Sequence, residues 1–349
     1  MKTKYKLLTI TASLLACGLG VSANANANAY AVATDNIRNG SVFIGVDTGT
    51  DGIPDTINAA AINVASPPAS VSATSATLNG FGGSSSCPGA CGPNMTGPDA
   101  LPSIGTGSPA RGNEDVTGAY YNLFGYASTQ PAYSWGDAIV NTEQTLTGTP
   151  IVARNAAESN IPGTGSAASD ARNSSSTAVI ANINAGSDCN TLKCAISFSF
   201  DADPYIHALL DNNAGPGSVA RGVLTFNITL TQHLAGGGTV TVFDWAPDGK
   251  VVPGGVIPGG TEQLDAESLN LTREALLKGQ DSEYSGPYAG GFFGSYFAYT
   301  NYLLPGSYTL SISMSEATDV LRTVPEPGSL ALLGLGLTGL AVVRRRKWH

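Results

Sequence analysis

Apolar and polar residues alternate along several short segments in the second half of the chain. In residues 195–200, isoleucine and phenylalanine alternate with serine, which is the pattern of a strand with one buried face. The same alternation recurs in residues 223–231, 239–243 and 308–314, and turn residues separate these segments. Short strands punctuated by turns predict an all-β, β-sandwich-like body with long loops rich in Gly, Ser and Pro.

Three other segments have weaker patterns. Residues 205–210 are compatible with a single helical turn, and residues 262–277 are partly compatible with a helix. Residues 65–112 combine low charge with many Ser, Gly and Pro residues, which predicts weak order. The β-sandwich therefore remains the predicted architecture of the body.

The first 31 residues have the pattern of a secretion signal. Three lysines stand within the first six residues, residues 7–21 are largely apolar, and Ala-Asn-Ala steps recur in residues 22–31. Each step offers the small residues that a signal peptidase requires. We therefore predict a signal helix, export by the Sec machinery and cleavage after Ala29, with Ala27 and Ala31 as alternative cleavage positions.

The C-terminal residues have the pattern of a second membrane-directed segment. A Pro-Glu-Pro block precedes residues 330–343, which carry no charge and predict a short transmembrane helix, and a basic end follows. By the positive-inside rule the basic end stays in the cytoplasm, so the body faces outward. The residues are Pro325, Glu326 and Pro327 in the block, and Arg344, Arg345, Arg346 and Lys347 in the basic tail.

This order of Pro-Glu-Pro block, apolar helix and Arg-rich end resembles the PEP-CTERM sorting signal of exosortase substrates. The resemblance implies that an exosortase in the cytoplasmic membrane recognises the tail and cleaves near the Pro-Glu-Pro block. It also implies export by a Gram-negative bacterium that makes exopolysaccharide. A fainter resemblance to the EDSAP-type subfamily rests on Glu114 and Asp115. An ordinary tail anchor is the alternative interpretation.

The two terminal signals divide the chain into four parts. We predict a signal peptide at residues 1–29, a low-charge strand and loop region at residues 30–112, a main β domain at residues 113–323 and a sorting signal at residues 324–349. We expect transient anchoring in the cytoplasmic membrane, followed by a place at the cell surface or outside the cell.

Removal of both basic ends leaves a strongly acidic body. The formal charge of the whole chain is −9, and loss of the three N-terminal lysines and the four C-terminal basic residues changes it to −16. The body has no cluster of Lys and Arg, which argues against nucleic acid as a partner. An acidic surface favours solubility outside the cell and cation binding.

Four of the five cysteines lie in the body. An oxidising compartment favours disulfides, and we predict the local pairs Cys87–Cys91 and Cys189–Cys194, because turn residues separate the members of each pair. A zinc site is the alternative, although no histidine lies near either pair in the sequence. The fifth cysteine, Cys17, follows a weak lipobox, so lipid attachment there competes with the signal-peptide interpretation.

An acidic loop is a candidate calcium site. Asp47, Asp51 and Asp55 stand at positions 1, 5 and 9, with Gly52 at position 6, which resembles an EF-hand or thrombospondin-type loop. The loop departs from that pattern at position 3, which is glycine, and at position 12, which is asparagine. Ca²⁺ is the only cofactor that the sequence suggests, and an Asp/Gly turn is the alternative.

The sequence offers little for catalysis. His207 follows Asp201 and Asp203 and could serve as a base or a metal ligand, but a solvated loop at a strand end explains the same residues. The chain has no Gly-x-Ser-x-Gly elbow, His-Glu-x-x-His helix or P-loop. We predict that the protein is not an enzyme. A secreted hydrolase remains an alternative, because the carboxylate pair of a glycosidase leaves no short motif in the sequence.

Aromatic residues are concentrated between residues 284 and 302. Exposed rings stack on sugars, whereas buried rings pack a core. The predicted function is structural or adhesive, at the surface or in the matrix of a biofilm or floc, with a carbohydrate-binding module for exopolysaccharide as the alternative. The aromatic residues are Tyr284, Tyr288, Phe292, Phe293, Tyr296, Phe297, Tyr299 and Tyr302.

Overall fold

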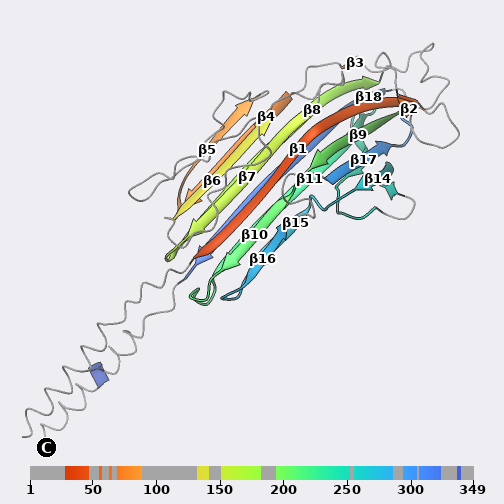
Figure 1. Cartoon of the computed structure of the whole chain (residues 1–349). Helices are drawn as coiled ribbons and strands as arrows, with labels where there is room; N and C mark the ends of the chain where they lie inside the picture. Colours follow the sequence, from red (N-terminus) through yellow and green to blue (C-terminus); the bar gives the residue numbers. More distant parts are fainter. Residues whose placement is uncertain are drawn as a thin grey trace, which may run out of the picture.

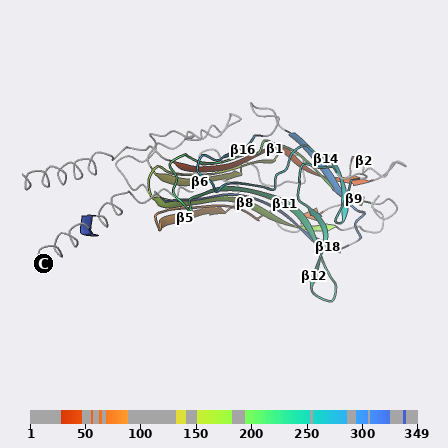
Figure 2. The same ribbon diagram turned by 90° about the horizontal axis from the view of Figure 1, so that it is seen from below.

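The computed structural model confirms the all-β body. It describes residues 28–46, 55–56, 63–64, 69–88, 132–140, 151–181, 194–251, 255–285, 294–304, 306–323 and 336–338. These residues form two antiparallel sheets that lie face to face, as the edge-on view in Figure 2 shows. Strands from before and after residue 112 contribute to both sheets.

The first sheet is built around one long strand, β1, as Figure 1 shows. Its strands are β1 (Ala29–Val46), β2 (Asp55–Thr56), β6 (Tyr133–Val140), β7 (Ile151–Ile161), β9 (Cys194–Ala202), β10 (Tyr205–Leu210), β13 (Val256–Ile257), β14 (Gly260–Asp265), β16 (Asp281–Ser285) and β17 (Gly294–Thr300). Near its start, β1 pairs with β10 on one edge and β7 on the other. Further along, β9 replaces β10 as the partner.

The second sheet is built around β18, which pairs with β11 on one edge and β8 on the other. Its strands are β3 (Asn63–Val64), β4 (Ala69–Leu78), β5 (Phe81–Pro88), β8 (Gly165–Ala181), β11 (Val219–His233), β12 (Thr239–Trp245), β15 (Leu271–Ala275) and β18 (Gly306–Arg322). Along β11 buried residues mostly alternate with more exposed ones, as its sequence pattern predicts.

The space between the sheets holds two different apolar regions. At one end, large rings pack together, including Phe200 stacked on Tyr296 with ring centroids 4.8 Å apart. At the other end the facing side chains are mostly small, with Ala29 and Ala31 of β1 lying against Ala220 of β11. These interior residues occupy alternate positions of β1, so the residues between them point to the outer face of the first sheet.

Two weaker sequence predictions were wrong. Residues 205–210 form strand β10 and not a helical turn, because Ile206, Ala208 and Leu210 alternate inward and pair with β1. Residues 262–277 contribute to β14 and β15 and contain no helix. The region expected to be weakly ordered contains the hairpin β4–β5, whose two-residue turn places Asn79 and Gly80 at positive φ, as a tight hairpin requires.

The two predicted terminal helices lie outside the described residues, except for residues 336–338, which are helical. Among the residues that are described, no helix is long and apolar enough to span a membrane.

Two of the buried carboxylic acids, Asp35 and Glu316, influence each other in the space between the sheets. Asp35 on β1 is opposite Asn155 on β7, and both side chains are inaccessible to solvent. Burial, and to a smaller extent the charge of Asp203, raise the pKa of Asp35 to about 7, although a backbone N–H partly offsets the increase. Burial and the nearby charge of Asp35 raise the pKa of Glu316 on β18 well above its usual value. Both acids therefore favour the protonated form in the folded protein.

The buried acids make stability dependent on pH. The folded state binds the proton of Asp35 more tightly than the unfolded state does, so its contribution is complete below pH ~4 and is lost as the pH rises to about 7. The D35N variant should show a smaller decrease in the free energy of unfolding across this range. Urea unfolding at several pH values measures the decrease, with Asp281→Asn on the exposed outer face as the control. Identical pH profiles for D35N and the wild type would contradict this assignment.

Candidate functional site

One end of the sandwich holds both ends of the folded body. At the N-terminal end, the backbone N–H of Asn28 donates to the carboxylate of Asp211, and the N–H of Asp211 donates to the carbonyl of Asn28 at 3.1 Å. At the C-terminal end, Thr323 accepts a hydrogen bond from the N–H of Gly215 at 2.8 Å and donates its hydroxyl to the carbonyl of Pro216 at 2.7 Å. The segment 211–218, which we call the end loop, thus binds both chain ends.

This arrangement places the two ends of the described body at the same end of the sandwich. Residues 1–27 precede Asn28 directly, and the predicted sorting signal begins one residue after Thr323. Because the end loop binds both Asn28 and Thr323, the predicted terminal signals are joined to the body at the same end of the sandwich.

The outer face of the first sheet carries a regular array of side chains, far from the end loop. Pairing of β1, β9 and β17 places Phe43 beside Ser197 and Ser197 beside Tyr299. In the next row, Ser199 lies between Ser41 and Phe297. In the third row, Asp201 lies beside Ser295. We call these eight residues, together with Asn39, the outer grid: Asn39, Ser41, Phe43, Ser197, Ser199, Asp201, Ser295, Phe297 and Tyr299.

The third row is completed by a bulge in β1. The pairing register of β1 shifts between Arg38 and Ser41, and Asn39 has a φ of 54°. Asparagine adopts this left-handed conformation more readily than most residues, and a bulge redirects the side chain that it carries. The Asn39 amide donates to the Asp201 carboxylate at 2.7 Å, and the Ser295 hydroxyl donates to the same carboxylate at 2.9 Å.

The outer grid therefore has an aromatic end and a polar end. Phe43 is 39% exposed, whereas Phe297 and Tyr299 are half-buried, with ring centroids 6.1 Å apart. Neighbouring strands lie ~4.8 Å apart, so Phe43 and Tyr299 are separated by ~10 Å across Ser197. A surface of this kind presents ring faces to the C–H groups of a sugar and presents hydroxyls and a carboxylate to its O–H groups.

The aromatic segment of residues 284–302 is divided between the core and the surface. Tyr296 is buried and stacks on Phe200, whereas Tyr284 donates its hydroxyl to the Glu267 carboxylate. Tyr302 is 39% exposed. Tyr288, Phe292 and Phe293 lie outside the described residues.

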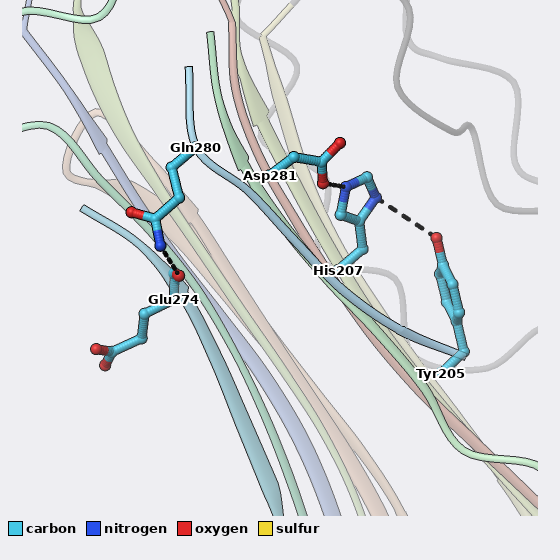
Figure 3. A network of polar contacts seen from close by, with 5 residues as sticks. All are labelled: Tyr205, His207, Glu274, Gln280 and Asp281. Atoms are coloured by element: carbon cyan, nitrogen blue, oxygen red, sulfur yellow. Dashed lines mark hydrogen bonds and ion pairs between the residues drawn. The ribbon is translucent and has the colours of Figure 1, made fainter. Parts of the chain in front are cut away.

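A second polar group occupies the outer face of the first sheet near the end loop, and Figure 3 shows part of it. His207 on β10 contacts Asp281 on β16 through Nε2 and Oδ1 at 2.7 Å. Its Nδ1 lies 3.5 Å from the hydroxyl of Tyr205, on the same strand. Asp201, proposed from the sequence as a neighbour of His207, instead belongs to the outer grid on β9. The carboxylate that contacts His207 is 74 residues away in the sequence, which local motifs cannot reveal.

A buried carboxylate links the strands next to this histidine. Glu158 on β7 is inaccessible to solvent and accepts hydrogen bonds from the hydroxyls of Tyr30 at 2.8 Å and Tyr133 at 3.0 Å. The indole N–H of Trp135 donates to its other oxygen at 2.8 Å. Burial and the charge of Glu158 raise the pKa of both tyrosines, which keeps them protonated as donors. Glu158 thus connects β1, β7 and β6.

Loss of this carboxylate should destabilise the first sheet. The Glu158→Ala variant removes the acceptor of two buried hydroxyls and one half-buried indole N–H, and we expect the free energy of unfolding to decrease by about 3 kcal/mol. The control is Glu274→Ala, because Glu274 forms a half-exposed ion pair with Arg221 that is worth less than about 1 kcal/mol. Equal effects of the two variants in chemical denaturation would show that Glu158 does not have this role.

Most of the remaining predicted site residues lie outside the part of the chain that the structure describes. They comprise the sorting motif Pro325, Glu326 and Pro327, the basic tail Arg344, Arg345, Arg346 and Lys347, the cysteines Cys91 and Cys189, and the calcium ligands Asp47 and Asp51. Asp55 is the first residue of β2, and Cys87 pairs with Ser72 in the β4–β5 hairpin. Cys194 is buried at the start of β9, where its predicted partner would lie just before the strand. The calcium site and the disulfide pairing stay predictions.

Ala29, the predicted last residue of the signal peptide, is the first residue of β1. Its side chain is buried between the sheets.

Comparison with known proteins identifies the C-terminal segment. Residues 323–347 match the model of the PEP-CTERM protein-sorting motif. The match begins at Thr323, the residue that the end loop binds. Curated proteins and solved structures gave no match to the chain.

Proposed function

We propose that this protein, whose PEP-CTERM motif makes it an exosortase-sorted surface protein, holds extracellular polysaccharide to the cell surface and has no catalytic role. The outer grid is the observation that carries this proposal. It combines three accessible or half-buried rings with hydroxyls and the Asp201 carboxylate on a three-stranded surface. Such a protein would contribute adhesion and structure to a biofilm or floc.

The position of the outer grid supports an adhesive role. Both terminal signals leave the sandwich at the end loop, and the grid involves the part of β1 beyond residue 38, at the other end of that strand. A body held to the membrane or to its sorting enzyme through the end loop therefore presents the grid away from that surface. Polysaccharide outside the cell can then reach the grid.

The surroundings of His207 favour a binding protein rather than a hydrolase that uses this histidine as its base. In the described part of the chain, its hydrogen-bond partners are Tyr205 and Asp281. A serine, threonine or cysteine nucleophile would have to lie within hydrogen-bond reach of such a base, and neither partner is one of these residues. Asp281 is 59% exposed and His207 only 13% exposed, so water competes mainly for the carboxylate. A polar pair of this kind suits contacts with hydroxyl groups.

Removal of the rings should release polysaccharide. We expect the Phe297→Ala/Tyr299→Ala variant to bind the exopolysaccharide of its own cells at least ~10-fold more weakly, because each lost stacking contact is worth about 1 kcal/mol. Co-sedimentation with purified polysaccharide measures this affinity. The control is Phe81→Ala, because Phe81 is 68% exposed but lies on β5 of the other sheet. Unchanged binding by a double variant that melts normally would reject the grid as the binding surface.

Processing provides a separate test of the surface location. Exosortase cleavage should leave a mature chain that ends between Pro325 and Ser329, and this end should disappear in cells that lack the exosortase. Mass spectrometry of extracellular protein identifies the terminal peptide. Recovery of intact residues 344–349 from extracellular material would contradict processing.

A further inference from the structure

The backbone nitrogen of Asn28 contacts a carboxylate, which is the partner that a charged terminal amine would prefer. Asn28 immediately precedes β1, is inaccessible to solvent, and donates its N–H to the carboxylate of Asp211 in the end loop. The second oxygen of this carboxylate accepts the N–H of Asn213 at 2.9 Å, which fixes its orientation. A carboxylate gains most from such a contact when the donor is charged, because charge-assisted hydrogen bonds are about twice as strong as neutral ones.

The three possible cleavage positions differ in what they would remove from the fold. Cleavage after Ala31 or Ala29 deletes Asn28 together with Ala29, which pairs with Leu210 and Ile161 on its two sides. It also removes Ala29 from the apolar interior. Cleavage after Ala27 deletes no residue of the folded body and uses the small residues Ala25 and Ala27.

We propose that signal peptidase hydrolyses the bond between Ala27 and Asn28, and that the new α-ammonium of Asn28 forms a buried ion pair with Asp211. In this step water adds across the peptide bond, so that Ala27 receives a carboxylate and Asn28 an amino group that takes up a proton. The ion pair is absent from the precursor, where the same nitrogen is a neutral amide.

The ion pair gives the mature N-terminus a structural role. It fixes the start of β1 to the end loop, which also binds Thr323 at the other end of the body. The buried Arg322 lies near enough for the charge of Asp211 to raise its pKa, although burial has the larger and opposite effect. Asp211 thus interacts with positive charge at both ends of the mature chain. This inference depends on export but not on polysaccharide binding.

Identification of the first residue of the mature protein tests the cleavage position. Full-length protein is produced in an exporting host, recovered after secretion across the membrane, and digested for mass spectrometry. We expect the N-terminal peptide to begin with Asn28. A mature chain that begins with Tyr30 or Val32, or that retains residues 1–27, overturns the proposal. Polysaccharide binding by the same sample is measured separately, so failure of one idea does not decide the other.

Amine labelling of the folded mature protein tests the ion pair. An ordinary α-amine has a pKa of ~8, against ~10.4 for lysine, and therefore reacts faster than lysine near pH 7. The buried, paired amine of Asn28 should instead react at least ~10-fold more slowly than the exposed Lys250 in the native protein, and should react faster than Lys250 after unfolding. In Asp211→Asn the native amine should lose this protection, whereas Asp281→Asn should keep it. Fast labelling in the native wild type overturns the ion pair, even if D211N fails to fold.

Discussion

The pairing of β1 on both of its edges is the constraint on which the rest of the first sheet depends. Near its start the strand has β7 on one side and β10 on the other, and β9 takes the place of β10 from Ile37 onward. No other strand of this sheet contacts so many partners among the described residues. Its inward residues pack the interior, its first residues meet the end loop, and its last residues enter the outer grid.

The interior changes character along the length of β1. Alanines fill much of the interior near the end loop, whereas stacked rings fill it at the other end. Between these regions lie polar groups that bond across the sandwich. The Asn155 amide donates to the carbonyl of Met314 at 3.1 Å, and the Ser159 and Thr318 hydroxyls lie 2.8 Å apart. Directional bonds of this kind fix the relative position of the sheets, which alanine contacts alone would not do.

The sequence predicted the strands whose apolar residues are large. Residues 195–200 and 223–231 lie within β9 and β11, because Ile, Phe and Leu alternate with small polar residues there. It did not predict β7 and β8, because alanine, serine and asparagine give almost no contrast between an inward and an outward position. The start of β1 was assigned to the signal peptide for a related reason, since alternating alanines fit a cleavage region and an alanine-packed strand equally well.

The sites were predictable only where they are local in sequence. The Pro-Glu-Pro block and its flanking residues form one continuous motif, which the comparison confirmed. The outer grid comes from three strands spread over more than 250 residues, and its rows exist only through strand pairing. The aromatic segment supplied Phe297 and Tyr299, but nothing in the sequence indicated that Phe43 and Asp201 would join them. The contact between Asp211 and Asn28 likewise depends on the pairing of β10 with β1.

The long ladders of β18 also determine how the body resists mechanical force. This strand pairs along its whole length, with 17 residue pairs to β8 and 15 to β11, and it ends beside the sorting signal. Tension applied through the C-terminal segment would pull β18 along its own axis. Its hydrogen bonds would then share the load in shear and could not open one after another, as they would if the strand were peeled from an edge. The fold is thus suited to bear tension applied through the end that carries the sorting motif.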